Sequence, residues 1–161
     1  MNDPDKFGLA TALAQARKSY QDGGIPIGAA LLYHDPSLQP SDPVVLGCSH
    51  NQRIQKSSPT LHAEIAALED AGRLKADVYR KSTMVRPVAG DLITQPSNSA
   101  ILLYKIPRVV IGENKTFLGG EELLKEHGVE VKVVDDVECK ELLARFVKER
   151  PDEWMEDIGK L

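Results

Sequence analysis

Two side chains able to do acid–base chemistry stand two residues apart in the stretch Pro-Thr-Leu-His-Ala-Glu, residues 59–64. Pro59 and Thr60 are typical of a helix entrance, which places His62 and Glu64 in the first turn, beside free backbone N–H groups. An imidazole titrates near neutral pH and can bind a metal or transfer protons. A carboxylate in a dry pocket can have a raised pKa and shuttle protons, or it can simply offset the helix dipole.

A His-x-Glu pair on one helix is half of the pattern that zinc-dependent nucleobase deaminases use. In those enzymes Pro-Cys-x-x-Cys begins the next helix, and the glutamate shuttles protons without binding the metal. The present chain has two cysteines, Cys48 and Cys139, far apart and in no such motif. They are expected to be free thiols, because neither a disulfide framework nor a four-ligand zinc site can be built from them.

Longer stretches of the chain resemble the fungal cytosine deaminase family, which belongs to the cytidine deaminase-like superfamily. The similar stretches are DGGIPIGAALL, GCSHNQRIQKSSPTLHAEIAALEDAGRL, YKIPRVVIGEN, VKVVDDVECK and ERPDEWMEDIG. This resemblance covers nearly the whole chain. It implies an α/β fold, a three-layer α/β/α sandwich with a central mixed five-stranded sheet, together with a homodimer and a pocket for a free pyrimidine base.

The resemblance also implies roles for single residues. Asn51 and Asp157 match positions that hydrogen-bond the base, and Phe117 and Trp154 match positions that enclose it. Each residue has a plainer interpretation, since Asn is common in turns and aromatic side chains pack C-terminal helices. Their joint occurrence favours a closed pocket for a small molecule. Among the paired acid–base residues, His62 matches a zinc ligand of the family.

The chain departs from the family where the two zinc-binding cysteines are expected. Counted back from Ile-Pro-Arg, Thr94 and Ser97 fall at those positions, Ile93 replaces a proline, and residues 86–91 make the preceding segment longer. Neutral hydroxyls are poor substitutes for thiolates, so we expect no metal and no other cofactor. The two hydroxyls are expected to cap a helix or to donate hydrogen bonds to a ligand oxygen.

Other residues are candidates for restoring a metal site. Asp91 stands three residues before the first of the two hydroxyl positions, and Cys48, His50 and His34 are more distant donors. Without a metal, water keeps a pKa near 15.7 instead of about 7, so ordinary hydrolytic deamination is expected to be lost or very slow. Arg86 adds a positive charge whose direction the sequence does not determine.

Three hypotheses for function follow. The first is a metal-independent enzyme that uses Glu64 as proton shuttle, with His62, for acid–base chemistry on a small heterocyclic or carbonyl- or imine-bearing metabolite. Asn51, Asp157, Trp154 and the other matched positions would hold this substrate. The second is a non-catalytic pseudo-deaminase that binds a ligand or partner, and the third is a zinc-dependent nucleobase deaminase with an unrecognised replacement ligand.

Composition limits the class of protein. The chain has 161 residues, 42% hydrophobic and 27% charged, which predicts one domain over residues 1–161. Its net charge of −4 comes from scattered charges, so nucleic acid is not an expected partner. The start lacks a basic region followed by an apolar run, and no stretch is apolar enough to span a membrane, which predicts a cytoplasmic protein.

The pattern of apolar residues predicts the elements that would position these side chains. Helices are expected over residues 9–20, 61–72, 97–105, 119–128 and 136–150, the last stopped by Pro151. Strands are expected over residues 25–33, 43–51, 81–88, 108–113 and 129–134. Because strands joined by helices need crossovers that cover the sheet, this order predicts helices on both faces of a mixed sheet.

Overall fold

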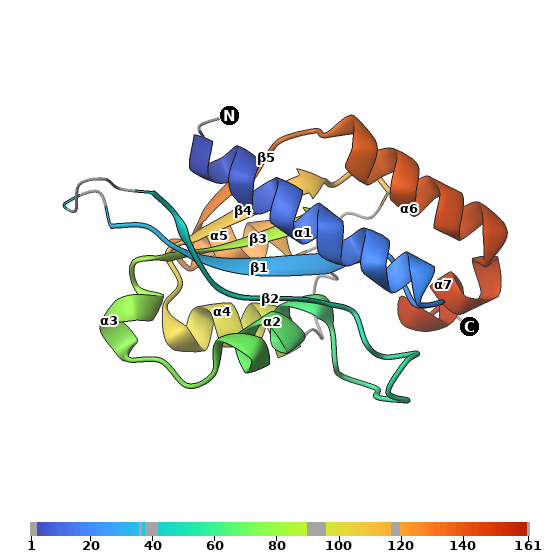
Figure 1. Ribbon diagram of the computed structural model, residues 1–161, viewed down its shortest axis with the longest axis horizontal. Helices are drawn as coiled ribbons and strands as arrows, with labels where there is room; N and C mark the ends of the chain where they lie inside the picture. Colours follow the sequence, from blue (N-terminus) through green and yellow to red (C-terminus); the bar gives the residue numbers. More distant parts are fainter. Residues whose placement is uncertain (1–2, 36, 38–41, 90–95, 117–119, 161) are drawn as a thin grey trace.

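A mixed five-stranded sheet in the order β2-β1-β3-β4-β5 runs through the centre of the protein (Figure 1). The computed structural model describes residues 3–35, 37, 42–89, 96–116 and 120–160. The strands are β1 (Gly28–Tyr33), β2 (Val44–His50), β3 (Ser82–Val88), β4 (Arg108–Glu113) and β5 (Glu130–Val133). β1 is antiparallel to both β2 and β3, whereas β3, β4 and β5 are parallel to one another.

Helices connect and cover these strands. They are α1 (Asp3–Gln21), α2 (Ala63–Ala71), α3 (Ala76–Tyr79), α4 (Pro96–Tyr104), α5 (Glu121–Glu126), α6 (Val137–Glu149) and α7 (Pro151–Asp157). The expected helices and strands are present, with most ends shifted by one to three residues, whereas α1 begins well before the expected residue 9, at Asp3. The short α3 and α7 are additions. Pro151 ends α6 as expected, but it also begins α7, because its fixed φ suits the first helical position.

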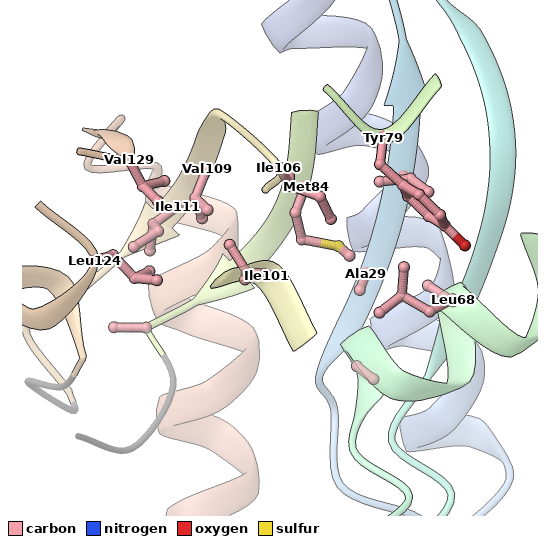
Figure 2. Packing of buried hydrophobic residues seen from close by; sticks show 14 residues of the cluster. Ala29, Leu68, Tyr79, Met84, Ile101, Ile106, Val109, Ile111, Leu124 and Val129 are labelled. Atoms are coloured by element: carbon pink, nitrogen blue, oxygen red, sulfur yellow. The ribbon is translucent and has the colours of Figure 1, made fainter. Parts of the chain in front are cut away.

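The two faces of the sheet carry separate apolar clusters, as the alternation of strand side chains requires. In β1, Ala30 and Leu32 pack toward α1, whereas Ala29 and Leu31 belong to the cluster that includes α2 and α4. Figure 2 shows this second cluster, with Met84 of β3 close to residues of α4 and β4. In Figure 1, α1 and α6 lie above the sheet and α2 and α4 below it. The predicted three-layer arrangement is confirmed.

Two glycines allow helices to approach the sheet closely. A Cβ on Gly28 would fall well inside contact distance of the carbonyl oxygen of Ala12 in α1. A Cβ on Gly47 would clash in the same way with the backbone of Ala67 and Ala71 in α2. The position of α2 over β2 therefore depends on the missing side chain at Gly47.

The residues that could do acid–base chemistry or bind a ligand lie at one end of the sheet. β2, β3 and β4 end there and β1 begins there, which follows from the strand directions. The helix α7 packs at this end through Trp154, which joins a cluster with Ile25, Val88 and Phe146. Within the described residues, no helix is both long and apolar enough to cross a membrane.

Candidate active site

The start of α2 holds the His-x-Glu pair in the protein interior. His62 is the residue before the first helical turn and is 9% exposed, and Glu64 stands inside that turn and is 3% exposed. The chain enters the helix through a turn. In this turn Ser58 Oγ accepts hydrogen bonds from the backbone N–H groups of Thr60 (3.3 Å) and Leu61 (3.1 Å). The first-turn prediction is confirmed for Glu64, whereas His62 lies one position earlier.

Arg86 of β3 reaches across to the start of α2. Its Nη1 donates a hydrogen bond to Glu64 Oε1 at 2.7 Å, and the two side chains are 0% and 4% exposed. Burial alone would raise the pKa of Glu64, but the Arg86 guanidinium, and to a smaller extent His62, hold that pKa below its ordinary value. Of the two alternatives for this carboxylate, the raised pKa does not hold, because a cation that the sequence did not reveal faces it.

Asn51 follows β2 and is fully buried. Its backbone N–H donates to Ile27 O at 2.8 Å, and its carbonyl accepts from Ser19 Oγ at 3.1 Å. The side-chain Oδ1 accepts from the backbone N–H of Arg53 at 3.0 Å, while Nδ2 has no partner within the described part of the chain. The turn-residue interpretation thus accounts for the oxygen of this amide but leaves its nitrogen available as a donor.

The helix α7 contributes Trp154 and Asp157. Trp154 is 6% exposed, and the Asp157 carboxylate pairs with Arg53 Nη1, which also donates to Asp157 O at 3.0 Å. Burial raises the pKa of Asp157, Arg53 and His62 act to lower it, and Glu64 acts to raise it further. These mutual influences mean that the carboxylate of α7 lies within electrostatic range of the start of α2.

A cavity of about 540 Å³ is bordered by one of these candidate residues, Asp157, and by its ion-pair partner Arg53. Its lining includes Arg53, Ser58, Glu156 and Asp157, from the segment before α2 and from α7. The ion pair between Arg53 and Asp157 therefore borders an open space, whereas His62, Glu64 and Arg86 are not part of the lining of this cavity.

The remaining candidate residues are only partly placed. Thr94, Phe117 and Asp91 lie outside the described residues, and of Ser97 only the backbone, in the first turn of α4, is described. Arg86 is the functional candidate whose partner the sequence did not identify. A single arginine within the apolar stretch 84–88 of β3 was the available signal, since a buried charge needs a partner.

The described residues do not fit a zinc ion. Within the described ranges no group of three His, Cys, Asp or Glu side chains could hold a metal. Cys48 accepts a hydrogen bond from Gln15 of α1, His50 contacts the carbonyl of Asn51, and His34 lines a small cavity with Asp5. None of the three more distant donors joins His62. A guanidinium already stands at Glu64, and a dication beside it would be repelled.

Comparisons with known proteins bear on the family and the fold. A cytosine deaminase of Candida albicans is 49% identical over 159 residues, which cover 99% of this chain and 99% of the relative. A tRNA-specific adenosine deaminase of Buchnera aphidicola is 26% identical over 159 residues, covering 93% of this chain and 92% of the relative. No protein-family model matches the chain.

A solved structure of guanine deaminase from Nitrosomonas europaea is similar in fold. It superposes with a TM-score of 0.68 at 17% sequence identity, covering 91% of this chain and 85% of the other. At this identity the likeness bears on the fold alone, and it agrees with the five-stranded mixed sheet and its covering helices.

Proposed function

The chain belongs to the cytosine deaminase family, and from this premise we propose that it is an enzyme acting on a nucleobase-like heterocycle. The observation that carries the proposal is the joint burial of His62 and Glu64 at the start of α2, at the end of the sheet where Asn51 and Asp157 also lie. Ligands of open α/β sheets bind outside the carboxyl ends of the strands, which is where these groups meet.

We further propose that the chemistry is metal-independent. Two features support this: Thr94 and Ser97 stand in the sequence where the family has its two zinc-binding cysteines, and Arg86 supplies a positive charge next to Glu64. Glu64 would accept a proton from the substrate or from water and return it to the product, and His62 would assist. Its low pKa makes Glu64 ionised at neutral pH and thus ready to act as the base, although a weak one.

The other residues would hold the substrate. Asn51 Nδ2 is a buried donor without a described partner, and it would donate to an acceptor atom of the ring. Asp157 would accept from a ring or amino N–H, and Trp154 would enclose the ring. We also propose substrate-binding roles, as the resemblance predicts, for Thr94, Ser97 and Phe117.

A second function, binding without catalysis, is favoured by the same ion pair. A carboxylate whose pKa is lowered by Arg86 is a weaker base, and water without a metal is a poor nucleophile. A pseudo-deaminase would keep the pocket and lose the turnover. In that case a ligand would raise the melting temperature of the protein while a panel of metabolites stays unchanged.

One experiment separates these functions from zinc-dependent deamination. The metal content of the purified protein is measured, and ammonia release is followed with cytosine and a panel of heterocycles. We expect less than stoichiometric zinc and a turnover that Glu64→Gln abolishes. Glu69→Gln, on the exposed face of the same helix, is the control and should leave the turnover unchanged. Stoichiometric zinc together with cytosine deamination would refute metal independence, and a replacement ligand would then have to exist.

Several predictions about the whole protein stay proposals. We propose a single domain over residues 1–161, a homodimer, a cytoplasmic location, a small-molecule ligand, and no nucleic acid partner. The net charge of −4 argues against binding to a phosphate backbone, although one relative is a tRNA-specific enzyme. Sedimentation of the protein, alone and with tRNA, tests the dimer and the exclusion of nucleic acid together.

A further inference from the structure

Arg86 has hydrogen-bonding capacity that the described residues use only in part. Its side chain is 0% exposed, and a guanidinium carries five N–H donors in a planar arrangement. Nη1 donates to Glu64, whereas Nε and Nη2 have no acceptor in the part of the chain that the structure describes. In folded proteins nearly all buried N–H groups have a hydrogen-bond acceptor. We therefore expect these donors to meet an acceptor that the described residues do not supply.

The two unpaired nitrogens form one edge of the guanidinium. The N–H groups of Nε and Nη2 point side by side, and the contact with Glu64 is made by the third nitrogen. Such an edge matches two acceptor atoms held next to each other in one plane, as in a carboxylate or in the ring-nitrogen and oxygen edge of a base.

A second buried donor lies at the same end of the sheet. Asn51 follows β2 and Arg86 stands near the end of β3, and both strands end on the side where β1 begins. Asn51 Nδ2, like the free edge of Arg86, has no described acceptor. A ligand bound at this end would therefore meet a surplus of donors, and it must supply acceptors to satisfy them.

Charge selects between the two kinds of acceptor pair. Glu64 already offsets the charge of Arg86, and its carboxylate lies 2.7 Å from the same guanidinium. An anionic ligand on the free edge would bring a second negative charge close to Glu64, whereas a neutral ring would not. A neutral acceptor pair is therefore the better match.

We propose that the Nε and Nη2 edge of Arg86 binds the adjacent ring nitrogen and oxo group of a neutral oxo-heterocycle, which makes Arg86 a specificity-determining residue. This inference rests on the proposed function, because it assigns a ligand edge within the same site. Cytosine presents such a pair in N3 and O2. Uracil carries a hydrogen on N3, and 3-deazacytosine has a C–H group there, so each offers the Arg86 edge one acceptor fewer.

The test compares these three ligands on the full-length protein by calorimetric titration. We expect cytosine to bind about tenfold or more tightly than uracil or 3-deazacytosine, as for other bidentate arginine contacts to a base edge. In Arg86→Lys, which keeps the charge but lacks the planar edge, the three affinities should converge. Arg73→Lys, at an exposed position, is the matched control and should keep the wild-type ratio.

The outcomes distinguish this inference from the proposed function. Equal binding of cytosine and 3-deazacytosine by the wild-type protein overturns the role of Arg86, and this comparison needs no variant that might misfold. An unchanged ratio in Arg86→Lys overturns it as well. If either of these two results is found but Trp154→Ala abolishes cytosine binding, the proposed substrate pocket is still supported and only the role of Arg86 is overturned. Preferred binding of pyrimidine-4-carboxylate would make the edge an anion site, and binding of none of the ligands would overturn both proposals.

Discussion

Nη1 of Arg86 and Oε1 of Glu64 lie 2.7 Å apart in a part of the interior where neither side chain is more than 4% exposed. The pair joins β3 to the first turn of α2. It thereby connects the central strand of the sheet with the helix that carries the candidate acid–base residues. Because both charges are withdrawn from water, each depends on the other.

Breaking this pair from one side should be costly. We expect Arg86→Met to lower the free energy of unfolding by about 3–5 kcal/mol, because it leaves a buried carboxylate without its cation. Adding Glu64→Gln should recover part of the loss, since the uncompensated charge is then gone. Urea denaturation of the wild type, both single variants and the double variant measures the coupling. A double variant whose loss equals the sum of the two singles would argue against a buried pair.

Gly47 should be intolerant of a side chain. A Cβ at this position would clash with the backbone of Ala67 and Ala71 in α2, which cannot move aside as a flexible side chain can. We expect Gly47→Ala to destabilise the protein by about 1–3 kcal/mol or more and to weaken ligand binding, because α2 carries His62 and Glu64. Val44→Ala, at the exposed start of the same strand, is the control. Equal melting temperatures for the two variants would contradict this packing.

The dependence of stability on pH should have an identifiable source in Asp5. Burial alone would raise the pKa of this carboxyl, but hydrogen bonds from Arg108 and Lys132 hold it below its ordinary value. A carboxylate with a lower pKa in the folded state stabilises the fold above the unfolded value, about 3.9 for Asp. That contribution is lost as the pH falls through the folded pKa.

Asp5→Asn tests this assignment. The variant should be less stable than the wild type near neutral pH, and the difference should shrink as the pH is lowered toward about 3. Urea unfolding across this pH range measures both effects. Asp77→Asn, at an exposed position of α3, should follow the wild-type profile. A difference between Asp5→Asn and wild type that is constant with pH would mean that Asp5 acts through packing instead.

The two cysteines should differ in reactivity. Cys139 is 1% exposed, and burial, together with Asp136, raises the pKa of its thiol well above the usual range. Cys48 is partly exposed, and its pKa is also raised by burial. Since the thiolate is the reactive form, iodoacetamide should modify Cys48 slowly and Cys139 only after unfolding. Mass spectrometry of the native and urea-unfolded protein measures this order, and prompt labelling of native Cys139 would contradict it.

The sequence contained enough local information to predict most elements of the fold. Each strand follows from a short β-branched or apolar run, and the longer helices follow from apolar residues at helical spacing. The sequence pattern does not separate the short α7 from α6, because Pro151 both ends one helix and is a good first residue of the next. The packing of Trp154 against the end of the sheet holds this short helix in place, and no local sequence pattern reveals that contact.

The candidate site divides in the same way. Asn51, His62, Glu64, Trp154 and Asp157 were identified from the sequence and its resemblance to a family. The direction of Arg86 was decided only by the tertiary structure, because the register of β3 against β1 and β4 determines which face of the sheet a strand residue points to. The electrostatic state of Glu64 depends on that direction. The sequence of this protein therefore determined which acid–base residues are present. The long-range packing decided that Glu64 faces the positive charge of Arg86.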